Sequence, residues 1–333
     1  ISDDNLGFFH RWVEEFAKNT EEVFVITNFV GEYHLPDNVK IFSSGKEKRF
    51  GRIRRYFNFF RNLFKILPES DAVFIHMIPA WAVMSWPLCK IFSKKIYLWY
   101  THKSVTFSLR AAEKIVEKIF TASAKSFRLP SKKTVILGHG IDIEKFKPIV
   151  SNQSPFADFQ IITAGRIASS KNLDVLIEAA AILKKQAVDF KIKIAGAPIT
   201  DEDKKYFEKL KNKVKESGLA DKVYFSGAIS YKEIEKFYQT GDLFVNLSNT
   251  GSLDKSALEA MACGLNVLVS NEAFFDILPE ENLIKELDAA SLAEKIKLFM
   301  LNNIPAGNLR EIAVKNHDLK NLIKKLIENI NIK

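Results

Sequence analysis

The residue types best suited to hold an anion occur together at one turn in the second half of the chain. Arg166 and Lys171 lie five positions apart within residues 164–172, between an apolar run and an amphipathic stretch. A strand-to-helix turn of this kind can direct two cations and several backbone N–H groups at one anion. Taken alone, each residue is better explained as part of a solvated helix start, so the case for a phosphate site depends on the segments that follow.

A second polar loop leads into a helix further along the chain. Residues 246–264 begin with Ser, Asn, Thr and Gly and continue in an apolar helical pattern, with Glu259 about one turn inside the helix. Backbone N–H groups near residues 253–256 would point at a phosphate. The Glu259 carboxylate could accept hydrogen bonds from ribose hydroxyls, and an ordinary surface carboxylate is the alternative.

Parallel sheets must position these loops. Short β-rich runs alternate with helical patterns along the chain, which predicts an α/β fold with parallel sheets. The expected strands are 23–28, 39–42, 72–76, 95–100, 118–122, 134–137, 160–164, 190–195, 223–226, 243–247 and 266–269. The expected helices are 8–18, 52–67, 82–92, 172–185, 201–217, 231–239, 255–263, 291–299 and 309–329.

The alternation falls into two series, which predicts two doubly wound domains. Residues 148–155 are polar, contain two prolines and resemble a linker. We expect an N-terminal domain over 1–150, a C-terminal domain over 156–305, and a helical tail over 306–333 that could pack back on the first domain. A ligand would bind in the cleft at the carboxyl ends of the strands.

The start of the chain departs from this pattern. A doubly wound domain begins with a strand at the centre of its sheet, whereas here a polar loop over residues 2–7 leads directly into a helix. The sequence therefore predicts a first sheet with a gap between the strands at 23–28 and 72–76. It also predicts that the chain is truncated at its N-terminus and that an apolar strand added ahead of Ile1 would stabilise it. A sheet built in a different way is the alternative.

The order of the second-half segments resembles glycosyltransferase family 4, over residues 161–270. The matching features are Gly165-Arg166 with Lys171, Phe225-Ser226-Gly227 before a Tyr-containing helix, a strand that ends in Ser248, and Glu259-Ala260-Met261-Ala262-Cys263-Gly264. Weaker matches in the first half are the loop around Gly7, Thr101-His102 and residues 140–146.

The resemblance implies a GT-B fold, with two Rossmann-like domains facing across a cleft, and a retaining glycosyltransferase. It implies a UDP or GDP sugar as donor, a glycan or lipid-linked hydroxyl as acceptor, no metal and no cofactor, as in cell-envelope polysaccharide biosynthesis. Its catalytic residues would be Arg166, Lys171 and His102. Its donor-binding residues would be Gly7, Gly165, Gly196, Ala228, Ile229, Asn249, Thr250, Gly251, Ser252, Leu253, Asp254, Lys255 and Glu259.

Individual roles follow from the same resemblance. Arg166 and Lys171 would hold the diphosphate, Glu259 the ribose, the backbone at 228–229 the base, and His102 the transferred sugar. Many relatives carry a sugar-binding Glu eight positions before the helix Glu, and this chain has Gly251 there. Asp254 and Asn249 are the candidates to replace it. An epimerase or a catalytically silent nucleotide-sugar-binding protein is the alternative function.

The segment 46–65 interleaves basic and aromatic residues at roughly helical spacing. It would suit an interfacial helix on an anionic membrane, and equally a domain helix with a solvated basic face. Nucleic acid is a less suitable partner, because no recognised module surrounds the segment. The formal net charge of +9 favours an anionic partner.

Cys89 and Cys263 lie in apolar surroundings, which predicts buried free thiols. No run reaches the roughly 18 apolar residues of a membrane span. With no signal-peptide pattern at the start, the sequence predicts a cytoplasmic protein that could associate peripherally with the inner face of the membrane.

Overall fold

The structure is a computed structural model of the 333-residue chain. It describes residues 7–148, 158–302, 304 and 306–331. The chain divides into two compact units, one of residues 1–140 with 319–333 and one of residues 141–318. The expected linker over 148–155 lies, apart from Pro148, outside the described residues.

The second unit is built on one parallel sheet of five strands. These are β7 (Phe159–Ala164), β8 (Phe190–Ala195), β9 (Val223–Gly227), β10 (Leu243–Asn246) and β11 (Asn266–Val269). Their order across the sheet is β11-β10-β7-β8-β9, and every neighbouring pair is parallel. The order of winding reverses between β7 and β10, so the carboxyl ends of these two strands form the switch point at which ligands bind in such sheets.

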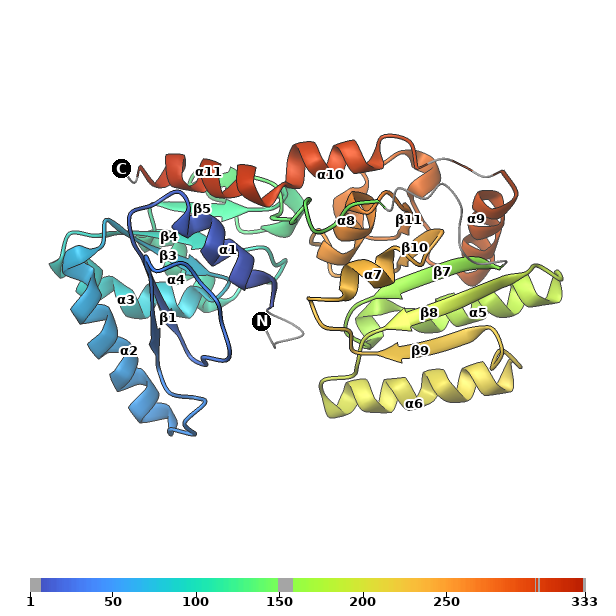
Figure 1. Ribbon diagram of the computed structural model, residues 1–333, viewed down its shortest axis with the longest axis horizontal. Helices are drawn as coiled ribbons and strands as arrows, with labels where there is room; N and C mark the ends of the chain where they lie inside the picture. The colour runs from blue at the N-terminus through green and yellow to red at the C-terminus, as the bar shows by residue number, and fades with distance from the viewer. Residues whose placement is uncertain (1–6, 149–157, 303, 305, 332–333) are drawn as a thin grey trace. The chain divides into compact units, whose positions relative to one another are not determined.

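Helices cover both faces of this sheet. Helix α5 (Leu173–Lys185) packs against α6 (Asp201–Glu216) and α9 (Ala289–Asn302), and α8 (Lys255–Ala262) packs against α7 (Ile234–Tyr238) and α10 (Leu309–His317). Figure 1 shows α5 and α6 on one face of the strands and α7 and α8 on the other. On the face covered by α5, α6 and α9, alternate strand residues and these helices form one apolar core cluster.

The first unit contains two separate parallel sheets. One pairs β1 (Val23–Thr27) with β2 (Val39–Ser43), and the other has the order β3 (Ala72–His76), β4 (Lys95–Trp99), β5 (Lys118–Thr121), β6 (Thr134–Ile136). Within the described residues, β1 pairs only with β2 and β3 only with β4. The sheet is thus interrupted between the two strands where the sequence predicts a gap. All five residues of β1 and of β3 are half-buried, whereas four of the five in β4 are buried.

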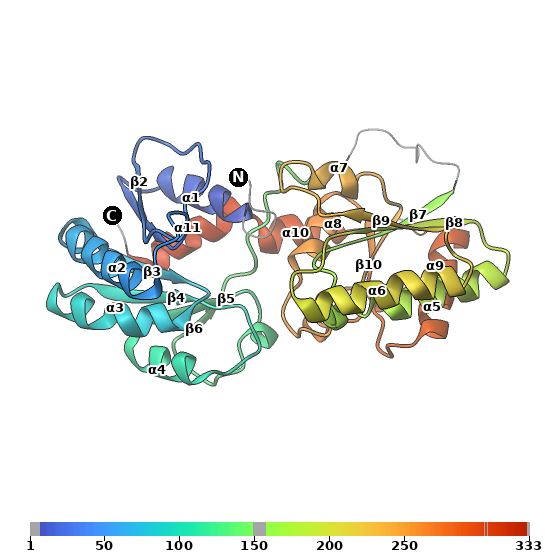
Figure 2. The ribbon, with the colours of Figure 1, turned by 90° about the horizontal axis from the view of Figure 1, so that it is seen from below.

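Strand β4 separates two layers of helices in this unit. Ile96 and Leu98 belong to the core beneath α2 (Arg52–Ile66), α3 (Pro79–Ile91) and α4 (Phe107–Ile115). On the opposite face, Trp99 meets Trp12 of α1 (Phe8–Ala17) with ring centroids 5.1 Å apart. Helix α11 (Leu319–Ile330) runs beside α1 in Figures 1 and 2, and its end accepts hydrogen bonds from the Tyr97 hydroxyl and the Lys118 ammonium.

Several helix predictions differ from the structure. The expected helix 231–239 covers only Ile234–Tyr238, the expected 291–299 extends over Ala289–Asn302, and α4 was not predicted. The expected continuous helix 309–329 is divided at Asp318, whose extended backbone pairs with Ile141. Helix α3 begins at Pro79, three residues before the expected start at 82, because a proline fits the first helical turn. Short 3-10 turns complete the described structure at Leu67–Glu69, Ala124–Ser126, Ser169–Lys171, Glu272–Phe274 and Glu280–Asn282.

Candidate nucleotide-sugar site

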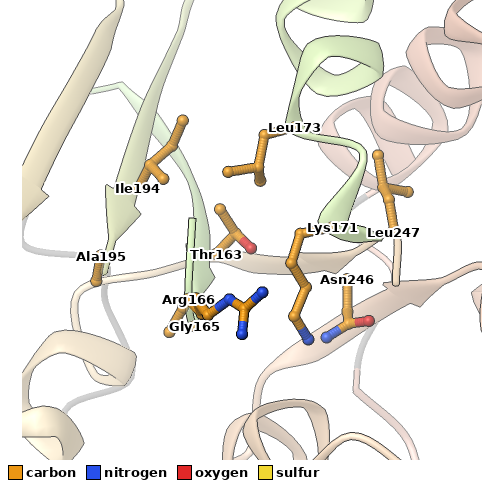
Figure 3. Close-up of a pocket in the computed structure, with 10 residues that line it drawn as sticks. Thr163, Gly165, Arg166, Lys171, Leu173, Ile194, Ala195, Asn246 and Leu247 are labelled. Carbon is orange, nitrogen blue, oxygen red and sulfur yellow. The ribbon is translucent and has the colours of Figure 1, made fainter. Parts of the chain in front are cut away.

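A small pocket lies at the switch point of the second unit. Strand β7 contributes Thr163 and Ala164, followed by Gly165 and Arg166; the ends of β8 and β10 and the turn before α5 supply the remaining lining residues, namely Lys171, Leu173, Ile194, Ala195, Asn246 and Leu247. Figure 3 shows the charged ends of Arg166 and Lys171 on the same side of this pocket, with the Asn246 amide next to the Lys171 ammonium. The structure therefore brings together the two cations that the sequence segments, taken as a set, predicted at an anion site.

Two glycines let the ends of β7 and β8 approach closely. The backbone of Gly165 has a φ of +144° and that of Gly196 a φ of +142°, both outside the range that other residues favour. A Cβ placed on Gly196 would lie 1.8 Å from the carbonyl oxygen of Gly165. Only glycine fits at 196, because any larger side chain would collide with the backbone just before Arg166.

One side-chain and one backbone hydrogen bond join the two loops that carry the site. The Asn172 amide donates to the Leu247 carbonyl at 2.7 Å, and the Asn249 N–H donates to the Ser170 carbonyl at 3.3 Å. On the far side of the second loop, the Asn271 amide donates to the Ser252 carbonyl at 2.6 Å. The first two bonds hold the loop after β10 against the turn that carries Lys171, and the third holds that loop against the segment after β11.

Each of the two cations is paired with a carboxylate. Arg166 Nε lies 3.1 Å from Asp203 Oδ2, and Lys171 Nζ lies 3.0 Å from Asp254 Oδ1. The Arg166 side chain is 47% exposed and that of Lys171 is 19% exposed, so Lys171 is the more enclosed charge. An anion that bound here would compete with, or add to, these internal pairs.

Asp203 is a site residue that the sequence reasoning missed. It forms a capping box with Thr200 at the start of α6, and it accepts from the N–H groups of Ile199 and Thr200 at 3.2 and 3.0 Å. Those bonds and Arg166 hold the pKa of Asp203 below its ordinary value although burial opposes them. The Thr-x-x-Asp pattern signals the helix cap in the sequence, but it does not show that the carboxylate also reaches Arg166.

Glu259 is buried inside the second unit. The Tyr238 hydroxyl donates to Glu259 Oε2 at 2.9 Å, and the two side chains belong to α7 and α8. Burial raises the pKa of Glu259, and Lys255 and the Tyr238 hydrogen bond partly offset it. Burial also lowers the pKa of Lys255 to about 8, which the Glu259 and Asp142 carboxylates partly oppose. Glu259 is thus not the ordinary surface carboxylate of the alternative interpretation.

The other expected donor-binding residues of this unit lie on loops after its strands. Ala228 is exposed and Ile229 is half-buried directly after β9. In the loop after β10, Asn249 is exposed, Thr250 and Ser252 are half-buried, and Gly251 and Leu253 are buried. The buried Leu253 side chain leaves only its backbone for a ligand to contact.

Gly7 and His102 belong to the first unit. Gly7 is buried at the start of α1 and has right-handed helical backbone angles. His102 is exposed in the loop after β4, where its Nδ1 accepts from the Ser104 N–H at 3.0 Å. The latter bond leaves Nε2 of the neutral ring as the nitrogen that can donate to a ligand.

Both cysteines are buried free thiols, as expected, and burial raises their pKa values to about 11 for Cys89 and about 12 for Cys263. No group of three or more His, Cys, Asp or Glu side chains among the described residues is arranged to hold a metal ion. In the part of the chain that the structure describes, no helix combines the length and the apolar character needed to cross a membrane.

A solved structure with a similar fold covers nearly the whole chain. It is that of Anabaena Alr3699/HepE in complex with UDP and glucose, which aligns with 99% of this chain and 98% of its own at a TM-score of 0.79 and 18% identity. The fold is therefore GT-B, built from two Rossmann-like domains.

Two curated proteins align with the chain over 155 and 194 residues. Mannosylfructose-phosphate synthase of Agrobacterium fabrum is 27% identical over 44% of this chain and 34% of its own length. The putative colanic acid biosynthesis glycosyltransferase WcaL of Escherichia coli is 25% identical over 55% of this chain and 46% of its own. The matched stretches thus span less than half the length of either relative.

The family match centres on the unit that contains the pocket. Residues 142–319, more than half of the 333-residue chain, match the family described as glycosyl transferases group 1. They include the β7 turn with Arg166 and Lys171, the loop after β10 and the Glu259 helix. The chain belongs to the glycosyl transferases group 1 family.

Proposed function

We propose that this chain transfers a sugar from a nucleoside diphosphate sugar to a hydroxyl of a glycan or lipid-linked acceptor, with retention of anomeric configuration, as in glycosyltransferase family 4. The observation that carries the proposal is the position of Arg166 and Lys171 in one pocket at the switch point of the second unit. Cations at such a point suit a diphosphate, which is the leaving group of the reaction.

The second unit would bind the donor. Arg166 and Lys171 would balance the charge that develops on the diphosphate, together with backbone N–H groups at the start of α8. Glu259, fixed by Tyr238, would accept from the ribose hydroxyls, and the backbone at Ala228 and Ile229 would meet the base. These groups stabilise the leaving diphosphate in the way that a metal ion does elsewhere, so we expect transfer to need no metal.

The reaction itself exchanges one bond at the anomeric carbon. The bond from that carbon to the terminal phosphate oxygen breaks, and a bond to the acceptor oxygen forms on the same face of the sugar. The acceptor proton passes to the departing phosphate, so atoms and charge balance without a carboxylate nucleophile. His102 Nε2 would donate to a hydroxyl of the transferred sugar.

The acceptor side would operate at an anionic membrane surface through α2. Ile53, Phe57, Phe60 and Phe64 follow one another at helical spacing and are 87%, 66%, 37% and 57% exposed. The core face of α2 is made by other residues, namely Phe59, Leu63 and Ile66. The helix carries five basic residues and no acidic one. An exposed apolar stripe beside unopposed positive charge is suited to the interface of an anionic bilayer.

A binding screen tests the donor assignment. The chain is titrated with UDP-glucose, UDP-N-acetylglucosamine, GDP-mannose and glucose 1-phosphate while its unfolding temperature is recorded, since a ligand that binds only the folded state raises that temperature. We expect at least one nucleotide sugar to stabilise the chain and glucose 1-phosphate to have no effect. Stabilisation by none of the nucleotide sugars would count against the proposal.

A further inference from the structure

We propose that Asp254 makes the donor site prefer the intact nucleoside diphosphate sugar over the free nucleoside diphosphate that transfer leaves behind. The inference rests on the proposed function, because it takes Lys171 as the group that binds the terminal phosphate. It concerns Asp254, which makes no capping hydrogen bond and whose ion-pair partner is the pocket residue Lys171.

Asp254 occupies the N-cap position of α8 without acting as a cap. Aspartate at this position ordinarily accepts from a backbone N–H of the first turn. Here the side chain makes no capping hydrogen bond. Its Oδ1 pairs with Lys171 Nζ at 3.0 Å, and its Oδ2 is buried with no hydrogen-bond partner among the described residues. The carboxylate is thus directed at the cation of the pocket and keeps one acceptor oxygen unused.

The carboxylate that pairs with Arg166 is bound differently. Asp203 accepts from two backbone N–H groups as well as from Arg166, and it completes the capping box of α6. Those bonds satisfy the Asp203 carboxylate whether or not an anion binds to Arg166. Asp254 has no such bonds in the described structure, so a diphosphate that binds Lys171 competes with this carboxylate for its ion-pair partner. The binding of an anion at the site should therefore change the interactions of Asp254 more than those of Asp203.

The charge of the ligand decides the sign of that coupling. In an intact donor the terminal phosphate is esterified to the sugar and carries one negative charge. After transfer the same group is a free terminal phosphate, held only by its anhydride bond, with about −1.5 to −2 charge at pH 7. The carboxylate beside Lys171 repels the more negative product more strongly than the donor, because the extra charge lies on the phosphate next to Lys171.

The sugar of the intact donor adds a favourable contact that the product lacks. Its hydroxyl groups are hydrogen-bond donors beside the terminal phosphate, and Asp254 Oδ2 is an acceptor without a partner. Residues 246–256, the loop that enters the site, contain no other carboxylate, since Gly251 has no side chain to offer. Repulsion of the product and attraction of the sugar therefore act in the same direction.

Calorimetric titration of the full chain with UDP, UDP-glucose, GDP and GDP-mannose tests this proposal. Asp254→Asn keeps the side-chain size and removes the charge, and Asp254→Ser removes the charge while keeping an N-cap residue. For the base that the wild type binds, both variants should bind the free diphosphate at least about tenfold more tightly, with the sugar form unchanged or weaker. Asp189→Asn is the matched control, because Asp189 is 70% exposed and lies at the amino end of β8, whereas the pocket lies at the carboxyl ends of the strands.

The outcomes separate this proposal from the donor assignment. If the wild type binds the nucleotides and both Asp254 variants leave the ratio of the two affinities unchanged, the role of Asp254 is wrong and the proposed function stands. If both variants bind the free diphosphate and the sugar form more weakly by the same factor, the role of Asp254 is also wrong and the proposed function stands. If the wild type binds none of the four, the proposed function fails and the role of Asp254 fails with it.

Discussion

The Tyr238 hydroxyl donates a hydrogen bond of 2.9 Å to Glu259 Oε2, and the Tyr238 and Glu259 side chains are 1% and 7% exposed. The bond joins α7 to α8 and fixes the one carboxylate that the proposed function assigns to the ribose. Burial raises the pKa of the Tyr238 hydroxyl, so it stays protonated and remains the donor at neutral pH.

Removal of this hydroxyl should affect both folding and ligand choice. Tyr238→Phe leaves Glu259 without its donor, and we expect the free energy of unfolding to fall by about 1–3 kcal/mol. The variant should also lose part of the preference for a ribonucleotide over its 2′-deoxy form, and Glu259→Ala should lose it entirely. Tyr224→Phe serves as control, because that hydroxyl is bonded to Asp221 on an exposed turn. Unaltered preference in Glu259→Ala would contradict the ribose assignment.

Lys171 should dominate turnover. Loss of one preorganised charge at a departing anion costs about 3 kcal/mol, so Lys171→Ala should lower kcat about a hundredfold. The variant should still fold, but its unfolding temperature should fall, because Asp254 loses its cation partner. Lys211→Ala, which removes a charge from the exposed face of α6, should leave kcat unaltered. Equal kcat values for Lys171→Ala and the wild type would refute the role of Lys171.

His317 should make the stability of the second unit depend on pH. Burial lowers the pKa of this 3% exposed ring to about 4, below the unfolded value of 6.5. The unfolded state therefore binds more protons between about pH 4 and 6.5, and the stabilisation is present above pH 6.5 and lost as pH falls through that window. The loss amounts to at most about 3 kcal/mol.

Urea unfolding at pH 7.5 and at pH 5 measures this effect. His317→Gln should lose less stability than the wild type when the pH is lowered, and the exposed His34→Gln should behave as the wild type does. An identical pH dependence in all three chains would show that His317 does not titrate on unfolding.

Most strands could be predicted because each is a short, largely apolar run in a parallel sheet whose faces are covered by helices. The bounds of 190–195 and 266–269 coincide with β8 and β11. Periodicity could not show the break at Asp318, because the helical pattern continues through it. The break depends on backbone pairing with Ile141, which is distant in the sequence. Local pattern sets the elements, and non-local pairing sets where this helix ends.

The cations of the candidate site could be predicted from the sequence, whereas the carboxylates that pair with them could not. The five-residue spacing of Arg166 and Lys171 in one turn allows both to face one anion, and the order of the segments that follow favoured that interpretation. The carboxylates that oppose them could not be assigned, because Asp203 and Asp254 reach the pocket from separate loops that only the order of the strands brings together. Which carboxylates pair with Arg166 and Lys171 is thus decided by the order of the strands and not by the residues 164–172.

Helix α2 should bind anionic vesicles in a salt-sensitive way, because each basic residue near the surface contributes about 1 kcal/mol. Arg54→Gln with Arg61→Gln and Lys65→Gln should weaken cosedimentation with phosphatidylglycerol vesicles and reduce its dependence on salt. Phe57→Ser with Phe64→Ser should weaken binding without changing the salt dependence. Phe107→Ser alters an 88% exposed side chain on α4 and should have little effect. Equal binding of the wild type to phosphatidylcholine vesicles would contradict an electrostatic role.

The most direct test of the central claim is to follow donor cleavage by proton NMR. The wild type is incubated with whichever α-linked nucleotide sugar raises its unfolding temperature most, with EDTA present and with simple alkyl glycosides as acceptors. Signals are recorded before the released sugar can mutarotate. We predict release of the nucleoside diphosphate with the α-configured product appearing first, and about a hundredfold slower release by Lys171→Ala. A β-configured first product, or a nucleotide sugar that binds and remains uncleaved with every acceptor, would contradict retaining sugar transfer by this chain.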